Sequence, residues 1–157
     1  MAKLTLEVYL SYSQVCIFNS SLTQPFNDWS ERNFSQGFSW RSGSVSFRGL
    51  IEEAQHKINL YLNESIPEID ASVVRAFTVP FEITDGNIEV ASISDSCPLE
   101  LPVGSYSLQI EFLETNDAET PEVNLRLNEG SSRFCIMKAD QEIVVEGDLD
   151  LNAQPAS

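Results

Sequence analysis

The chain has 157 residues, of which 42% are apolar, and it carries a formal net charge of −15. This length suits a single domain that buries enough surface to hold a core without disulfides or a metal. Nine basic residues against twenty-four acidic ones argue against binding to nucleic acid or anionic lipid, which needs basic patches, and favour a basic macromolecule as the partner.

Met1-Ala2-Lys3 leads straight into Leu4–Glu7, which alternates between apolar and polar side chains. This start lacks the apolar run of about 7–15 residues found in a secretory signal. No apolar run approaches the roughly 18 residues of a membrane span. The three cysteines, Cys16, Cys97 and Cys135, are odd in number and lack metal-ligand spacing, which indicates free thiols in a reducing compartment. We therefore expect a cytoplasmic protein.

The N-terminal part of the chain predicts two strands followed by a short helix. Apolar and polar residues alternate over 4–10, as in a strand with one buried face, and a shorter strand candidate follows at Val15–Phe18. A helix is predicted over 28–36. Its signals are the candidate caps Asn27 and Asp28, the capping-box partner Glu31 and the terminating Gly37. Its expected apolar face consists of Trp29, Phe34 and Phe38.

The middle of the chain predicts a series of strands separated by turns. In chain order the strand candidates are Val45–Arg48, 58–62, 77–83, Ile88–Ile93 and 106–112. A weak helical pattern lies at 50–55. The sequence Asp85-Gly86-Asn87 indicates a hairpin, because Gly and Asn tolerate positive φ, and Pro102–Gly104 indicates another tight turn. Pro80 interrupts one strand pattern and predicts an edge or a bulge there.

Strand candidates at 123–127, Phe134–Met137 and Ile143–Val145 complete the set. About ten short strands with regular turn signals predict an all-β fold, an antiparallel β-sandwich with one short helix. We expect this single domain to cover residues 1–145 and residues 146–157 to form an acidic, frayed C-terminal tail.

No set of residues with a catalytic signature is present. The single histidine, His56, is interpreted as a solvated surface residue, because no serine or cysteine nucleophile with a known signature accompanies it. The stretch 148–152 matches the first ligands of a calcium loop, but Ala153 occupies the position that needs glycine. We therefore predict a protein that is not an enzyme and that needs no metal or other cofactor.

Acidic residues gather in two stretches, Glu111–Glu122 and Glu142–Asp150. The first includes the longest connection without an apolar pattern, so its charge has no packing reason. We predict that Asp117, Glu119 and Glu122 contact a basic partner. Trp40 lies just ahead of a predicted strand and is the candidate for an exposed aromatic anchor. The alternative is that both stretches are solvated connections.

Several sequence blocks together resemble the competence protein J family, whose members are described as inhibitors of the DNA-entry nuclease. The blocks are LSYSQVCIF (10–18), Asp28-Trp29, GFSWRSGSVSF (37–47), VPFEIT (79–84), GNIEVASI (86–93) and LPVGSYSLQIEF (101–112). The resemblance covers residues 4–115 and implies an intracellular inhibitor that sequesters a nuclease. It transfers no individual site residue.

Two functions follow from these observations. The first is a nuclease inhibitor, or an immunity-type protein against a nuclease-domain toxin, whose carboxylates pair with the Arg and Lys groups that normally hold phosphates. The alternative is a small-ligand or carbohydrate-binding β-sandwich module, in which exposed aromatic residues such as Trp40 stack on the ligand. A continuous acidic surface favours the first function, and an aromatic groove favours the second.

Overall fold

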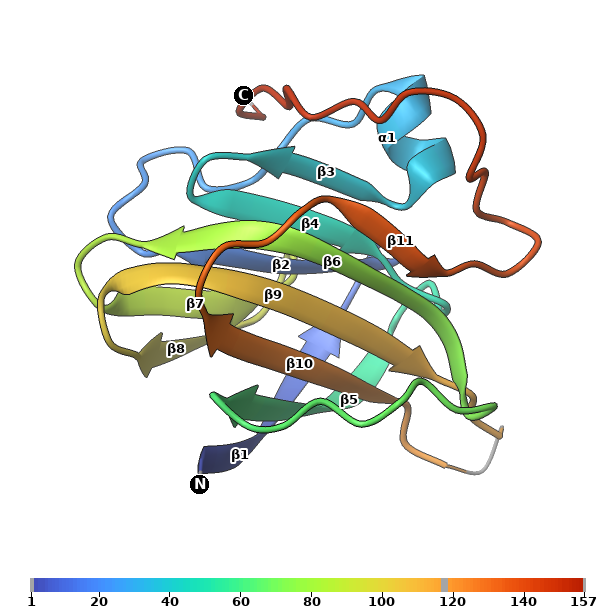
Figure 1. The fold of residues 1–157 in the computed structure, drawn as a ribbon, viewed down its shortest axis with the longest axis horizontal. Helices are drawn as coiled ribbons and strands as arrows, with labels where there is room; N and C mark the ends of the chain where they lie inside the picture. The colour runs from blue at the N-terminus through green and yellow to red at the C-terminus, as the bar shows by residue number, and fades with distance from the viewer. Residues whose placement is uncertain (1, 117–118, 157) are drawn as a thin grey trace.

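A computed structural model describes residues 2–116 and 119–156, and it contains two β-sheets packed face to face (Figure 1). In spatial order, the six-stranded sheet contains β1 (Ala2–Leu10), β5 (Ala54–Leu62), β10 (Glu122–Glu129), β9 (Gly104–Leu113), β6 (Val73–Ile83) and β11 (Cys135–Lys138). The five-stranded sheet contains β3 (Phe38–Arg41), β4 (Ser44–Arg48), β2 (Gln14–Asn19), β7 (Asn87–Ala91) and β8 (Ser96–Glu100). The predicted β-sandwich is confirmed, with one difference: β5 and β10 pair in parallel.

Alternation along the strands places one face of each sheet in the core, as the sequence predicts. In β9 the alternating residues Tyr106, Leu108, Ile110 and Phe112 are all buried. Aromatic rings join the two sheets at the centre, where Phe77 of β6 contacts two rings of the facing sheet. Its ring centroid lies 5.8 Å from that of Phe38 and 5.9 Å from that of Phe47.

Two strands were not predicted, because neither has a long alternating pattern. β3 is only four residues long, and β8 contains Pro98, which is tolerated because β8 is a sheet edge. Pro80 does not lie in an edge strand, since β11 pairs with β6. However, β11 reaches only the partners Ala76 to Thr78, so Pro80 lies beyond its end.

Two local predictions were wrong. Residues 143–145 form no strand; only Ile143 is buried there, whereas Val144 and Val145 are exposed. Residues 50–55 form no helix: residues 49–53 connect β4 to β5, and Ala54 and Gln55 begin β5.

The predicted helix is present as α1 (Glu31–Gln36), but it begins three residues later than the predicted range of 28–36. Its N-cap is Ser30 rather than Asp28, and Ser30 forms a capping box with Asn33. Gly37 ends the helix in the left-handed region, as predicted. The expected apolar face is different, because Phe34 is 55% exposed and Phe38 belongs to β3.

The segment 146–156, which the sequence predicts as a frayed tail, instead packs along α1 and β3 (Figure 1). The Asp150 amide donates to Oε1 of the buried Gln36, whose Nε2 donates back to the Asp150 carbonyl, each at 2.9 Å. Further on, the Ala153 amide donates to the Trp40 carbonyl at 3.0 Å. Two apolar side chains of the segment also pack against the core: Leu149 and Leu151. Long-range contacts therefore order a segment whose polar composition indicates a loose end.

The three cysteines are unpaired and differ widely in environment. Cys16 in β2 is fully buried, whereas Cys97 is half-buried and Cys135 is exposed. Burial raises the pKa of the Cys16 thiol to about 11, although the Ser46 hydroxyl, 3.2 Å from its Sγ, acts in the opposite direction. Cys16 is therefore a core residue with little thiolate at neutral pH.

We expect an aromatic disulfide reagent to modify native Cys135 fastest, Cys97 more slowly, and Cys16 only after unfolding, because the thiolate is the reactive species. Peptide mass spectrometry after timed labelling measures the three rates. A reductant should leave the melting temperature unchanged. Modification of native Cys16 at the rate of Cys135 would show that β2 is less protected than its burial indicates.

Candidate functional site

Connections that are far apart in the sequence meet at one end of the sandwich, the right-hand end in Figure 1. They include the β1–β2, β4–β5 and β9–β10 connections, the end of the β5–β6 connection and the chain just after β11. Backbone groups join them: Ser13 N–H to Glu52 O (2.8 Å), Glu114 N–H to Ser72 O (2.7 Å) and Lys57 N–H to Pro121 O (2.9 Å). Successive antiparallel strands bring alternate connections to the same end of a sheet.

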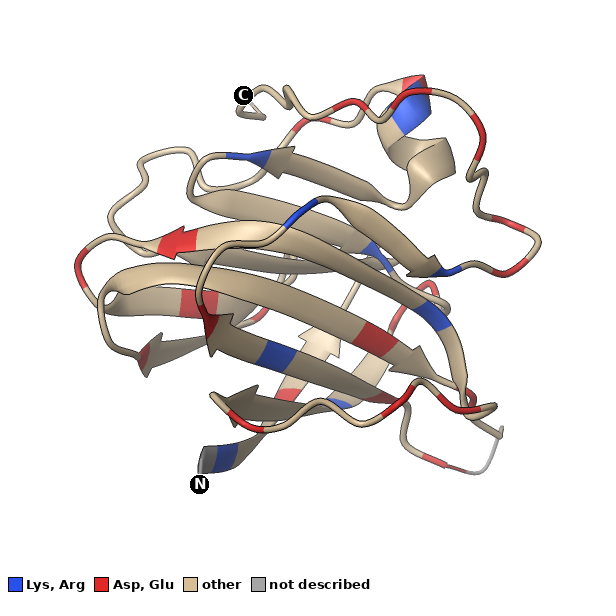
Figure 2. Ribbon diagram, in the orientation of Figure 1, with Lys and Arg blue, Asp and Glu red and all other residues tan. Residues whose placement is uncertain are grey.

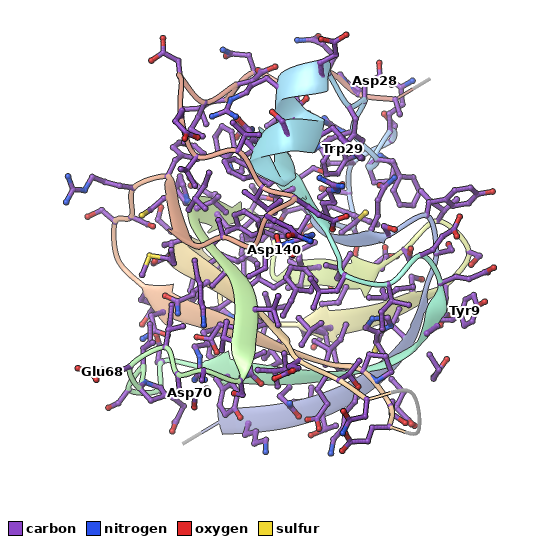
Figure 3. All side chains as sticks on the ribbon, turned by 90° about the vertical axis from the view of Figure 1, so that its right-hand side faces the viewer. Tyr9, Asp28, Trp29, Glu68, Asp70 and Asp140 are labelled. Carbon is purple, nitrogen blue, oxygen red and sulfur yellow. The ribbon has the colours of Figure 1, made fainter. Side chains whose placement is uncertain are left out.

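Most of the charged residues on these connections are acidic (Figure 2). We call this surface the acidic end and define it by Glu52, Glu53, Glu68, Asp70, Glu114, Glu119, Glu122 and Glu142. Figure 3 views this end directly, with Glu68 and Asp70 on one side and Asp140 near the centre. Basic residues are fewer among these connections and the adjoining strand ends: Arg48, Lys57, Arg75 and Lys138.

A fully buried arginine holds the acidic end together. Arg75 donates from Nη2 to Asp140 Oδ2 at 2.8 Å and to Glu142 Oε1 at 3.0 Å. Its Nη1 donates to the backbone carbonyls of Arg48 and Gly49, at 2.8 and 3.2 Å. Arg75 thus connects β6 to the end of β4 and to the chain after β11. A buried guanidinium needs this full set of acceptors, and the planar fork of arginine suits a paired carboxylate.

The carboxylates of the acidic end differ in how far the protein itself occupies them. Asp140 and Glu142 share the single positive charge of Arg75, and Glu53 accepts a hydrogen bond from the Tyr9 hydroxyl at 2.7 Å. Among the described residues, the side chains of Glu68 and Glu114 form no hydrogen bond or ion pair and are exposed. Exposed charges without an internal partner remain available to a partner molecule.

Asp70 stays ionised for a local reason. Its carboxylate accepts hydrogen bonds from the hydroxyl and the backbone amide of Ser72, and these bonds lower the pKa of Asp70. Lys138 lies nearby and donates to the Asp70 carbonyl at 3.2 Å. The Asp70 carboxylate therefore stays ionised to a lower pH than an ordinary aspartate.

The structure places the predicted acidic contacts as follows. Asp117 lies outside the described residues. Glu119 is exposed and accepts from Asn116 Nδ2 at 2.7 Å. Glu122 begins β10, is half-buried and accepts from Asn59 Nδ2 at 3.1 Å, opposite Lys57 in the ladder. Glu119 and Glu122 therefore belong to the acidic end, and their role as contacts stays a prediction.

Trp40 does not join these acids. It lies on β3 toward the opposite end of the sandwich and is half-buried rather than exposed. Its Nε1 donates to the Pro80 carbonyl at 2.8 Å, and its ring meets that of Phe134 edge to face with centroids 4.8 Å apart. Because its N–H and much of its ring are engaged, Trp40 is a packing residue between β3 and β6. Trp40 also lines a pocket together with Phe81 and Tyr106, and the small-ligand alternative stays a prediction.

Glu111 belongs to the first acidic stretch of the sequence but not to the acidic end. It is buried on β9 and pairs with Arg126 of β10, with 3.2 Å between Oε2 and Nε. Gln109 and Asn124 also donate to its carboxylate, at 2.7 and 3.0 Å. The Arg126 guanidinium in turn lies over the Tyr61 ring, 4.5 Å from its centroid. Glu111 is thus a structural charge that this network satisfies.

His56 is not the solvated residue that the sequence predicts. It is 4% exposed and occupies an inward position of β5 in the same alternation as Ile58 and Leu60. Its Nδ1 lies 2.8 Å from the Ala54 carbonyl oxygen, and burial lowers its pKa. Within residues 2–116 and 119–156, no cluster of His, Cys, Asp or Glu side chains suits a metal ion, and no helix has the length and apolarity of a membrane span.

Sequence reasoning missed Glu52, Glu53, Glu68 and Asp70 as parts of this surface. Glu52 and Glu53 lie before β5, and the other two lie before β6. No local pattern marks them, because they join Glu114 and Glu119 only through the order of the strands. The only sign of the shared surface is that every second connection along the chain contains acidic residues. This sign can be recognised only when the order of the strands in the sheets is known.

The fold and the site define a β-sandwich protein whose candidate site is a set of surface connections. The family model of Competence protein J (ComJ) matches residues 7–134, so the chain belongs to the competence protein J family. The resemblance in the sequence blocks is thereby confirmed. Residues 135–157 lie outside the matched range, and they include β11 and both carboxylates that pair with Arg75.

A DNA-entry nuclease inhibitor of Bacillus subtilis (strain 168) is 33% identical to this chain over 107 residues, which are 65% of this chain and 76% of that protein. Among solved structures, ComJ from Bacillus subtilis, described as an inhibitor of the DNA degrading activity of NucA, matches with a TM-score of 0.70 and 26% identity. It covers 81% of this chain and 96% of its own. The protein described as Crocagin biosynthetic gene J shares the fold at a TM-score of 0.57 and 16% identity, with 83% of this chain and 100% of its own covered.

Proposed function

We propose that this protein binds a nuclease and blocks its degradation of DNA. The observation that carries the proposal is membership of a family in which a Bacillus subtilis relative is a DNA-entry nuclease inhibitor and the similar solved ComJ inhibits NucA. In this proposal the chain is not itself an enzyme. It acts in the cytoplasm, where its unpaired thiols stay reduced.

The proposed mechanism is occlusion by the acidic end. A nuclease holds the phosphates of DNA with Arg and Lys side chains. The exposed carboxylates of Glu68, Glu114 and Glu119 would pair with those cations and so compete with DNA. The net charge of −15 would also speed the encounter with a basic partner. The same chemistry would suit a nuclease-domain toxin, whereas the family relatives favour a nuclease of the NucA type.

Inhibition is tested by adding the purified protein to DNA digestion by the NucA-like nuclease of its own organism, with Bacillus subtilis NucA as a second target. We expect stoichiometric loss of DNA cleavage with the first nuclease. The proposal fails if neither nuclease is slowed or bound at a large molar excess of the protein.

The role of the acidic end has a separate test. We expect the double substitution E68K/E114K to lower the association rate with the nuclease by about tenfold or more at low salt, because it reverses exposed charges that steer the encounter. The control E82K/E100K makes the same change in net charge at exposed residues toward the other end of the sandwich. Stopped-flow or surface-based kinetics at two salt concentrations measures both rates.

Equal slowing by the two double variants would show that only net charge matters, and the acidic end would lose its assignment as the contact surface. Unchanged rates in both would exclude electrostatic steering. In either case, inhibition by the unmodified protein would still support the proposed inhibitor function.

A further inference from the structure

The two sheets have four edges, and three of them are blocked in the described structure. The free side of β3 is covered by the C-terminal segment, where the Ala153 amide donates to the Trp40 carbonyl. β8 contains Pro98, and β11 is four residues long with a register shift between Ile136 and Lys138. Short edges, prolines and bulges are among the devices by which proteins prevent edge-to-edge pairing, and charged edge residues are another.

The fourth edge, β1, has no proline and no bulge, and its two charged residues, Lys3 and Glu7, have opposite signs. It pairs with β5 over nine residues in unbroken register and forms the lower edge of the sheet in Figure 1. At its C-terminal end the Tyr9 amide points away from β5 and donates to Asp95 Oδ2 at 2.8 Å. Backbone groups of alternate residues point to the same side of a strand. The outward groups of β1 therefore belong to Lys3, Thr5, Glu7 and Tyr9.

Only the last of these residues has its outward amide bonded. Within residues 2–116 and 119–156, the outward backbone groups of Lys3, Thr5 and Glu7 have no hydrogen-bond partner. The open part of the edge thus contains three outward-facing residues and is centred on Thr5. An open strand edge of this kind accepts another strand by main-chain hydrogen bonds.

We propose that β1 pairs with β1 of a second copy of this chain, antiparallel and about a two-fold axis at Thr5. The outward backbone N–H and C=O groups of one copy must face those of the other copy. Only odd-numbered residues of β1 can therefore exchange hydrogen bonds between the two copies. A register centred on Thr5 uses all three open residues of both copies. It places Lys3 of one copy directly opposite Glu7 of the other, and does so twice.

Side chains on both faces of the edge fit this register. Lys3, Thr5 and Glu7 lie on the outer face, where opposite charges directly across an antiparallel pair attract. Leu4 lies on the core-facing side with Leu6 but is 46% exposed, because it lies near the N-terminal end of β1. In the proposed pair Leu4 faces Leu6 of the second copy, which covers part of this exposed apolar surface.

The contact is confined to one strand edge, so the expected dimer is weak and depends on concentration. It leaves the acidic end of each copy free, because the open residues lie toward the N-terminal end of β1 and the acidic end adjoins its C-terminal end. The dimer therefore does not depend on the proposed nuclease inhibition, and either one can fail without the other.

Sedimentation equilibrium of the full chain over a range of concentrations tests the proposal. We expect a monomer–dimer equilibrium in the unmodified protein. Thr5→Pro removes only an outward amide, which costs no bond to β5, and it should abolish the dimer while the melting temperature stays close to that of the unmodified protein. K3E and E7K should each raise the dissociation constant roughly tenfold, because each places like charges opposite one another. The double variant K3E/E7K restores opposite charges and should recover the dimer.

R133E serves as the matched control, since it makes the same charge change as K3E at an exposed residue between β10 and β11. A protein that stays monomeric at every concentration would overturn the proposal. So would a dimer that Thr5→Pro and K3E leave unchanged, because its contact would then lie elsewhere. A monomer in which Thr5→Pro instead weakens nuclease binding would assign the β1 edge to the nuclease rather than to a second copy.

Discussion

Replacing Arg75 with alanine should lower the free energy of unfolding by about 3–5 kcal/mol, the range for breaking a buried ion pair from one side. The substitution would leave Asp140 without its cation and Glu142 with only its longer contact to Arg48, at 3.8 Å. It would also deprive the carbonyls of Arg48 and Gly49 of this donor. For a domain of this size each kcal/mol shifts the melting temperature by about 2–4 °C. Chemical denaturation with urea measures the change directly.

Arg133→Ala is the control for this experiment. It removes the same side chain from an exposed position and should change stability by less than about 0.5 kcal/mol. If the two alanine variants unfold at the same urea concentration, Arg75 does not hold the connections together. The variant Arg75→Lys should recover only part of the loss, because an ammonium group cannot replace the planar fork of donors.

Replacing Gly37 with alanine should cost about 2–5 kcal/mol, the sum of a backbone penalty and a steric one. Gly37 ends α1 with φ at 97°, a conformation that disfavours a side chain. An added Cβ would also lie 2.4 Å from Cζ of Phe77 and 2.9 Å from Cδ1 of Ile143. Phe77 is fully buried between two aromatic neighbours, so its ring has little room to move.

Gly147 offers a matched control for Gly37. Its φ is 90°, so Gly147→Ala has a similar backbone penalty, but an added Cβ would meet no atom within 4 Å. The difference between the two alanine variants therefore isolates the contact with Phe77 and Ile143, and we expect it to be about 1–3 kcal/mol. Equal losses of stability would mean that the core shifts to accept the methyl group. Urea unfolding of both proteins measures this difference.

Both substitutions also test how the fold supports the acidic end. Asp140 and Ile143 belong to the chain after β11, which also supplies Glu142 to that surface. If the protein stays folded but loses the contacts that hold this part of the chain, the Glu142 side chain should occupy several positions. We expect nuclease binding to weaken more in Arg75→Ala than in Arg133→Ala when both are assayed well below their melting temperatures.

Local patterns predicted most of the strands, the short helix and the terminating role of Gly37. They failed where a local choice depends on distant partners. Asp28 and Ser30 are both good N-caps by residue type, and the structure uses Ser30, whose hydroxyl also donates to Asp150 at 2.8 Å. Residues 143–145 have β-forming side chains but lack a neighbouring strand.

For this protein, the sequence by itself determined the class of fold, the family and the sign of its charge. Alternation of apolar residues depends only on neighbours two positions apart, and the family is recognised by the order of such blocks. The tertiary structure decided which acids share a surface, that Glu111 is buried and Glu68 exposed, that β5 and β10 are parallel, and that the edge of β1 stays open. These features depend on which distant strands pair, because pairing buries whole faces and no short stretch of sequence contains that choice.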